Sequence, residues 1–190
     1  MNEKPVSANE LPLHGLSVVE LASLVLEKIR LWEENSKQYT GALHEFREQP
    51  ELLNRLVQLF SPSSLTVEDV KNQITDFYRA VLVQEPVLKV VAAAACVTRE
   101  VKQVLVEFLD RLECTGPYCQ PGEMGPMLEE VRINHHLEKL VLYKPLRLAL
   151  TGSVDGPEIS GVLAVIGIER TIKRVKKLLE TSNGKNAVKE

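Results

Sequence analysis

Residues 145–179, PLRLALTGSVDGPEISGVLAVIGIERTIKRVKKLL, hold the most informative pattern in this sequence. A Gly-Pro pair at positions 156 and 157 separates an opening Pro-Leu-Arg-Leu-Ala-Leu-Thr-Gly run from an apolar run that stops at Gly167. Proline suits the first turn of a helix, and glycine suits the position just past its end. We therefore expect one helix from Pro157 to Gly167 and a last one from Glu169 to about Thr181.

Apolar residues recur every three or four positions over almost all of the preceding chain, which is the spacing of one helix face. Ser17 and Glu20 form a capping-box pattern that begins a helix. Pro50 is expected to open a helix through Phe60, and Thr66 to cap the next one. No alternating segment is long enough to indicate a sheet. The predicted fold class is all-α, a helical bundle.

Further along the chain, Pro86 opens an apolar segment through Val97, which we expect to be the most buried helix. The apolar stripe of the following helix is Val101, Val104, Leu105, Phe108 and Leu112. Residues 113–125 are rich in Gly and Pro and indicate turns. A short helix is expected around residues 127–131.

A change in composition places a soft domain boundary near Thr98. We expect a flexible N-terminus at residues 1–10, a helical domain over residues 11–97, a second helical domain over residues 98–182, and a flexible tail at residues 183–190.

The composition excludes several classes of protein. Of the 190 residues, 44% are hydrophobic and 26% are charged, which is ordinary for a soluble globular chain. The longest apolar stretch, residues 87–97, contains Lys89 and is far shorter than the roughly 20 residues that span a bilayer. The N-terminus lacks the apolar region of a secretory signal. We expect a cytoplasmic protein, with an organellar stroma or matrix as the other compartment, and no membrane partner.

The net charge of −3 is unevenly distributed. Residues 139–190 contain ten Lys or Arg and five Asp or Glu, whereas residues 1–138 contain 13 basic and 21 acidic residues. A basic end on an acidic body could place a surface that faces phosphates at one end. The alternative is that the basic residues at positions 170–177 form the solvated face of a helix, and charge alone favours that interpretation.

The 145–179 stretch resembles the closing segment of bacterial-type glutamyl-tRNA synthetases, class I enzymes. In that family a Pro-Leu-Arg-x-Ala-Leu-Thr-Gly run precedes a Gly-Pro loop, a helix that ends in Leu-Gly-x-Glu, and a last helix with Arg and Leu. This sequence matches those elements in order, with Ile166-Gly167-Ile168-Glu169 at the third. The resemblance covers the anticodon-binding region and reaches back to about Thr98, and it implies the helical anticodon-binding fold of that family.

By position, the resemblance implies RNA contacts from Arg147, Gly156, Pro157, Ile159 and Ser160. An arginine presents a planar fork of donors suited to a base edge or a phosphate. Relatives often carry a bulky apolar residue where this chain has Ser160, which weakens any stacking contact there. The same positions could instead serve packing of the domain.

Neither catalytic motif of class I synthetases, His-x-Gly-His or Lys-Met-Ser-Lys-Ser, occurs in the sequence. We therefore expect no catalytic residue, no enzyme activity of the chain alone, and no cofactor. The residues Cys114, Cys119, His135 and His136 could suggest zinc, but their spacing is looser than in common zinc motifs. We favour a loop with incidental thiols and expect no metal.

Two functions remain open from the sequence. The first is a non-catalytic module that binds the anticodon of a glutamate-type tRNA, as a fragment or as a free-standing chain beside a separate synthetase catalytic subunit. The second is a protein-interaction or regulatory subunit that reuses the fold without binding RNA. A DNA partner is expected in neither case.

Overall fold

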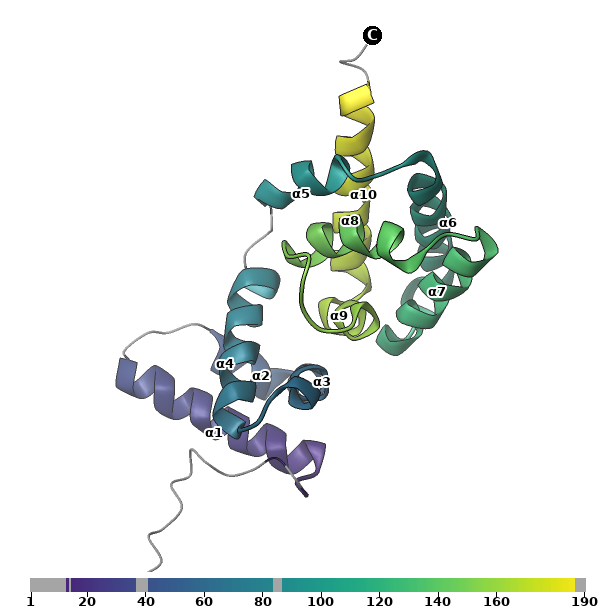
Figure 1. The fold of residues 1–190 in the computed structure, drawn as a ribbon. Helices are drawn as coiled ribbons and strands as arrows, with labels where there is room; N and C mark the ends of the chain where they lie inside the picture. Colours follow the sequence, from purple (N-terminus) through teal and green to yellow (C-terminus); the bar gives the residue numbers. More distant parts are fainter. Residues whose placement is uncertain (1–12, 14, 37–40, 84–86, 187–190) are drawn as a thin grey trace, which may run out of the picture. The chain divides into compact units, whose positions relative to one another are not determined.

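The computed structural model describes residues 13, 15–36, 41–83 and 87–186. Within these residues the regular elements are helical and no strand is present, which confirms the all-α prediction. The chain forms two compact units, residues 1–83 and residues 84–190 (Figure 1). The expected flexible N-terminus, residues 1–10, lies outside the described residues.

The N-terminal unit is a small helical bundle. Its elements are α1 (Val18–Ser36), α2 (Ala42–Glu48), α3 (Pro50–Phe60), a 3₁₀ turn (Ser61–Ser63), α4 (Val67–Phe77) and a π-helical stretch (Tyr78–Val83). α1 packs against α2, α3 and α4. The buried side chains between them include Val25, Ile29, Phe46, Leu56 and Ile74. Full burial of one such side chain contributes on the order of 2 kcal/mol, so this face holds the unit together.

Local start signals in this unit behave as predicted. The backbone N–H of Ser17 donates to Glu20 Oε2 at 2.8 Å, and the N–H of Glu20 donates to Ser17 Oγ at 3.3 Å. Thr66 and Asp69 form the same reciprocal pair at the start of α4. Pro50 is the first residue of α3. The sequence analysis did not identify α2 or the π-helical stretch.

The C-terminal unit contains the remaining elements. They are α5 (Val87–Ala94), α6 (Arg99–Thr115), 3₁₀ turns at Gly116–Tyr118 and Pro121–Glu123, α7 (Met124–Asn134), α8 (Lys139–Thr151), α9 (Ile159–Ile166) and α10 (Ile168–Asn186). α5 packs on α8 and α10, α7 packs on α6 and α9, and α10 also contacts α6, α8 and α9. Within the described residues, no helix is both long and apolar enough to cross a bilayer.

Three boundaries differ from the sequence expectations. The two units separate between residues 83 and 84, rather than near Thr98, because α5 packs on helices of the C-terminal unit. α5 is also not the most buried helix, since Val91 on it is 53% exposed. α10 continues to Asn186, well into the expected tail of residues 183–190, and residues 187–190 lie outside the described chain.

The end of α7 is closed without a glycine. The N–H of His136 donates to the Ile133 carbonyl at 2.9 Å, and the N–H of Leu137 donates to the Arg132 carbonyl at 3.1 Å. This pair of bonds is the Schellman motif, in which the residue after the cap adopts a left-handed conformation. His136 occupies that position with φ of 50°, which side-chain-bearing residues adopt at a cost.

We predict that His136→Gly stabilises the protein by about 0.5–1 kcal/mol, because glycine adopts a positive φ without the Cβ clash. Urea unfolding followed by circular dichroism measures the change in the free energy of unfolding. His136→Ala is the matched control, since it removes the imidazole and keeps the strain, and it should give no gain. A loss of stability in the glycine variant would contradict the assignment of strain to this residue.

Candidate functional site

One face of α8 and the loop that follows it enclose a pocket of about 470 Å³. The helix contributes residues at i, i+3, i+4 and i+7, which share one side of a helix. Its lining residues are Leu140, Tyr143, Lys144, Arg147, Val154, Asp155 and Gly156. The size falls in the range of small-ligand sites, and the lining combines apolar walls with two cations and a carboxylate.

The loop after α8 is shaped by short hydrogen bonds between neighbouring residues. Thr151 Oγ1 donates to the Arg147 carbonyl at 3.0 Å and accepts from the N–H of Ser153 at 3.2 Å. Ser153 Oγ accepts from the N–H of Asp155 at 3.3 Å. Hydroxyl side chains of this kind replace backbone partners in turns. They fix the course of the loop where it faces the helix.

Arg147 ties the loop back to α8. Its Nη1 donates to the Pro157 carbonyl at 2.6 Å. A Cβ placed on Gly156 would lie 3.3 Å from the same Nη1, and Gly156 has φ of 141°, which side-chain-bearing residues rarely adopt. Gly156 therefore allows the guanidinium to lie directly against the loop backbone. The structure brings together Arg147, Gly156 and Pro157, three of the predicted site residues.

The guanidinium of Arg147 is half-buried and has few partners. Burial lowers its pKa, and the carboxylate of Asp155 acts in the opposite direction. Arginine stays charged despite such shifts. Within the part of the chain that the structure describes, Pro157 O is the acceptor found for its five N–H donors. The pocket thus presents a partly desolvated cation whose remaining donors can bind an acceptor.

Pro157 does not begin the next helix, contrary to the sequence expectation. α9 begins at Ile159, Glu158 is its N-cap residue, and no side chain caps it. The first helical bond in this turn is from Val162 N–H to the Glu158 carbonyl, at 3.0 Å. The N–H groups of Ile159 and Ser160 precede that bond, so helix geometry leaves them without an intrahelical acceptor.

The side chains of Ile159 and Ser160 lie on the packed side of α9. Ile159 is 2% exposed and belongs to the hydrophobic core. A Cβ placed on Gly125 of α7 would lie only 2.5 Å from Ser160 Cβ and 3.0 Å from its Cα. The expectation that these two side chains face RNA therefore fails for Ile159. At Ser160 the structure shows a close approach of two helices.

The basic residues of α10 are only partly a solvated face. Arg174 is 8% exposed and donates through Nη1 to the Leu150 carbonyl near the end of α8. Lys176 pairs with Glu113 of α6. Arg170 and Lys173 are exposed. The helix therefore uses part of its charge to hold its neighbours and displays the rest.

The cysteines and histidines considered for zinc do not converge. Within the described residues, no group of three or more His, Cys, Asp or Glu side chains is placed to hold a metal ion. Cys119 is buried, burial raises the pKa of its thiol, and its Sγ donates to the Gln120 carbonyl. His135 lies 2.7 Å from Glu107 Oε2 on α6. These residues serve the packing of α6 and α7.

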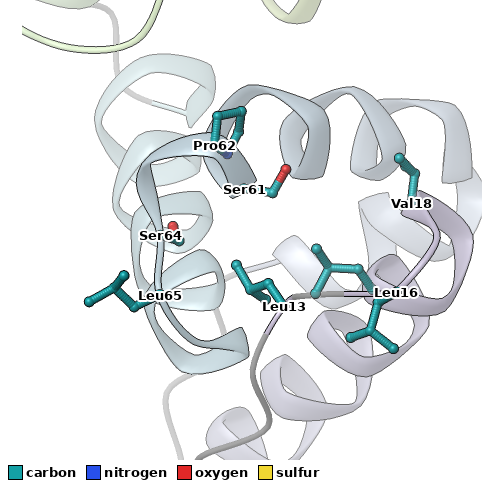
Figure 2. Close-up of a pocket in the computed structure, with 8 residues that line it drawn as sticks. Leu13, Leu16, Val18, Ser61, Pro62, Ser64 and Leu65 are labelled. Atoms are coloured by element: carbon teal, nitrogen blue, oxygen red, sulfur yellow. The ribbon is translucent and has the colours of Figure 1, made fainter.

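A second pocket, of about 430 Å³, lies in the N-terminal unit. Figure 2 shows Leu13 between Leu16 on one side and the turn that carries Ser64 and Leu65 on the other. The lining is aliphatic apart from two serines, and includes Leu13, Leu16, Val18, Leu21, Ser61, Pro62, Ser64 and Leu65. Because none of these residues is charged, the pocket lacks the groups that bind phosphate or a polar base edge.

Sequence reasoning missed Leu140, Tyr143 and Lys144. A helical pattern that continued through Pro145 would have placed them on the Arg147 face. Proline inside a helix removes one backbone donor and usually ends or bends it. Here Pro145 is buried within α8 and the helix continues past it to Thr151. The signal was present in the spacing, but Pro145 obscured it.

An all-helical chain with a cationic pocket between a helix and a Gly-Pro loop belongs to the class of helical RNA-binding modules if its family does. The family model described as "Anticodon binding domain" matches residues 20–179 of this chain. The chain therefore belongs to the anticodon-binding domain family. This finding agrees with the resemblance derived from residues 145–179 and extends it through both units.

Curated relatives are glutamate–tRNA ligases. The chain is 37% identical over 81 residues to glutamate–tRNA ligase 2 of a Nitratiruptor species, which covers 43% of this chain and 17% of that protein. It is 36% identical over 80 residues to ligase 1 of Sulfurimonas denitrificans, covering 42% and 17%. With ligase 2 of Syntrophus aciditrophicus it is 28% identical over 128 residues, covering 67% and 25%. The match thus spans a quarter or less of each relative's length.

We predict that Gly125→Ala destabilises the protein by about 1–3 kcal/mol, because the new methyl group would overlap Ser160. Adding Ser160→Gly should recover part of the loss, and urea unfolding of both variants gives the coupling between the sites.

Gly184→Ala is the control, because a Cβ at that position of α10 meets nothing within 4 Å. It should be neutral or gain up to about 1 kcal/mol from helix propensity. Equal stability of Gly125→Ala and the unmodified protein would show that α7 and α9 do not pack this closely.

Proposed function

We propose that the pocket beside α8 binds single-stranded nucleotides in the anticodon loop of a glutamate-type tRNA. The observation that carries this proposal is the half-buried guanidinium of Arg147, which has one acceptor on the loop and further donors toward the pocket. Membership of the anticodon-binding domain family supports the proposal. The names of the relatives supply the tRNA identity.

Recognition would combine a side chain with the loop backbone. Unstacked bases offer their edges and faces, which is the usual basis of RNA sequence recognition. Arg147 would donate to a base edge or a phosphate, and Gly156 and Pro157 would contact the RNA through their backbone. Ile159 and Ser160 would contribute backbone N–H groups at the start of α9, where an acceptor is favoured. Their side chains would act by packing.

Exposed cations near the site would provide attraction that does not depend on sequence. Lys144 lines the pocket and is exposed, and Arg170 is exposed on α10. Contacts of this kind release counterions, so they give binding that weakens as salt rises. Base contacts and phosphate contacts should therefore be separable by experiment.

We further propose that aminoacylation requires a catalytic domain outside these 190 residues. The two class I catalytic motifs do not occur in the sequence. A separate synthetase subunit or another protein would then be the partner, in the cytoplasm or in an organellar stroma or matrix. The alternative, a protein-interaction role without RNA binding, corresponds to an absence of RNA binding at low salt together with capture of a protein partner.

The first prediction from this proposal concerns the unmodified chain and Arg147. Fluorescence anisotropy should show binding to a glutamate anticodon stem-loop that weakens when the anticodon bases are changed. Arg147→Ala should lower the affinity for the cognate stem-loop about 10- to 100-fold, because charge-assisted bonds are lost. Arg147→Lys keeps the charge but not the planar fork, so it should recover affinity only in part.

Arg170→Ala is the matched control for Arg147. It should weaken binding to all stem-loops alike and reduce the salt dependence by about 0.7 ion per lost contact. Circular dichroism establishes that each variant is folded. Unchanged RNA affinity per folded Arg147→Ala molecule would eliminate Arg147 as a contact.

A second prediction concerns catalysis. ATP–pyrophosphate exchange with glutamate, with and without tRNA, should give no rate above buffer for the 190-residue chain. A full-length glutamate–tRNA ligase in the same assay is the positive control. A rate that follows the chain through purification would refute the proposed need for another catalytic domain.

A further inference from the structure

Tyr143, on the pocket side of α8, is held by a side chain from α7. Its Oη donates to Glu129 Oε2 at 2.8 Å. Glu129 also accepts from Arg132 on its own helix, with Nε at 2.8 Å from Oε2 and Nη2 at 2.7 Å from Oε1. The paired bonds between Arg132 and Glu129 fix the carboxylate in orientation as well as in position.

Arg132 is in turn fixed to the end of α7. Its Nη1 donates to the Leu137 carbonyl, while the N–H of Leu137 donates to the Arg132 carbonyl. Lys139 Nζ lies 3.5 Å from Glu129 Oε1. A continuous set of contacts thus runs from the capped end of α7, through Arg132 and Glu129, to the ring that lines the pocket. A ring held in this way loses little conformational freedom when a ligand contacts it.

The protonation states in this network are stable over a wide pH range. Bonds from Arg132 are the main cause that lowers the pKa of Glu129 to about 2. Burial, followed by the bond to Glu129, raises the pKa of Tyr143 to about 12. The tyrosine therefore remains a neutral donor and Glu129 an ionised acceptor from roughly pH 4 to 10.

We propose that Tyr143 contacts a nucleobase in this pocket and contributes to base selectivity, with Glu129 and Arg132 as the positioning residues that hold its ring. This inference rests on the proposed function, because it names the residue that contacts the base in the same site. It adds a residue of α8 to the contacts expected from Arg147 and the Gly-Pro loop.

The surroundings of Tyr143 suit a base better than a phosphate. Its hydroxyl proton is committed to Glu129, so it is not available to a phosphate oxygen. Glu129 and Glu158 both place negative charge near the hydroxyl, and each raises the pKa of Tyr143. The side chains of Leu140 and Val154 add apolar walls to the pocket. A neutral base can stack on such a surface, whereas a charged phosphate would be desolvated and repelled.

Lys144 provides the contrasting contact on the same helix. It is adjacent to Tyr143 in sequence, lines the same pocket and is exposed. A lysine acts on phosphate as a point charge. Removing Tyr143 should therefore change base selectivity at constant salt dependence, while removing Lys144 should change the salt dependence at constant selectivity.

The test measures affinity for the glutamate anticodon stem-loop and for stem-loops with each anticodon base changed or removed, at two salt concentrations. Tyr143→Ala should lower cognate affinity about tenfold or more, because stacking of a base is lost. Its preference for the cognate loop should fall, and its salt slope should stay that of the unmodified protein. Lys144→Ala should reduce the slope by about 0.7 and keep the preference.

Tyr118→Ala is the matched control, because Tyr118 is 85% exposed on the turn after α6 and does not line the pocket. It should bind as the unmodified protein does. Two milder variants test positioning: Tyr143→Phe and Glu129→Gln keep a ring in place but disturb its anchor. Each should lose about two- to tenfold in cognate affinity, with a smaller loss of preference than Tyr143→Ala.

The outcomes separate the two proposals. Anticodon-dependent binding by the unmodified chain, with an unchanged preference in folded Tyr143→Ala, overturns this inference and leaves the proposed function standing. A loss of salt dependence in Tyr143→Ala with the preference retained also overturns it, since that is the behaviour of a phosphate contact. Absence of RNA binding by the unmodified chain at low salt overturns both. If Tyr143→Ala does not fold, Tyr143→Phe and Glu129→Gln decide by the same comparison.

Discussion

The hydrogen bond from the Arg147 guanidinium to the Pro157 carbonyl closes the loop after α8 against that helix. The pocket exists because the loop returns to the helix at this point, and α9 begins two residues further on. The same bond partly desolvates the cation, and a charge removed from water binds an acceptor more strongly than one in bulk solvent. A single contact thus shapes the pocket and prepares its main donor.

α8 is the shared element of the C-terminal unit. α5 and α10 pack on it, and Arg174 of α10 donates to the Leu150 carbonyl near its end. Glu129 of α7 holds it through Tyr143 on the pocket side. Because neighbours fix this helix on several sides, the side chains that line the pocket are presented by a rigid support. Rigid placement lowers the entropic cost of ordering side chains on binding.

Much of the fold could be predicted because its signals are local. The pairs Ser17 with Glu20 and Thr66 with Asp69 satisfy backbone groups within one turn, so their effect is visible in the sequence. The burial of Ile159 and the close approach of Gly125 to Ser160 depend on how helices cross, which sequence spacing does not record. Arg147, Gly156 and Pro157 came from a family resemblance. Tyr143 and Leu140 were missed because Pro145 interrupted the expected helix, and tertiary packing overrode that local preference.

The crossing of α7 over α9 also bears on how this chain can vary. The space that a side chain at position 125 would need is already filled by the Cβ of Ser160 and by the backbone behind it. The two positions therefore share one volume, and neither can grow unless the helices move apart. In homologous sequences, the sizes of the residues at these positions should change together. A bulky residue at 160 then signals a wider helix crossing, with a start of α9 that is displaced relative to the loop it follows.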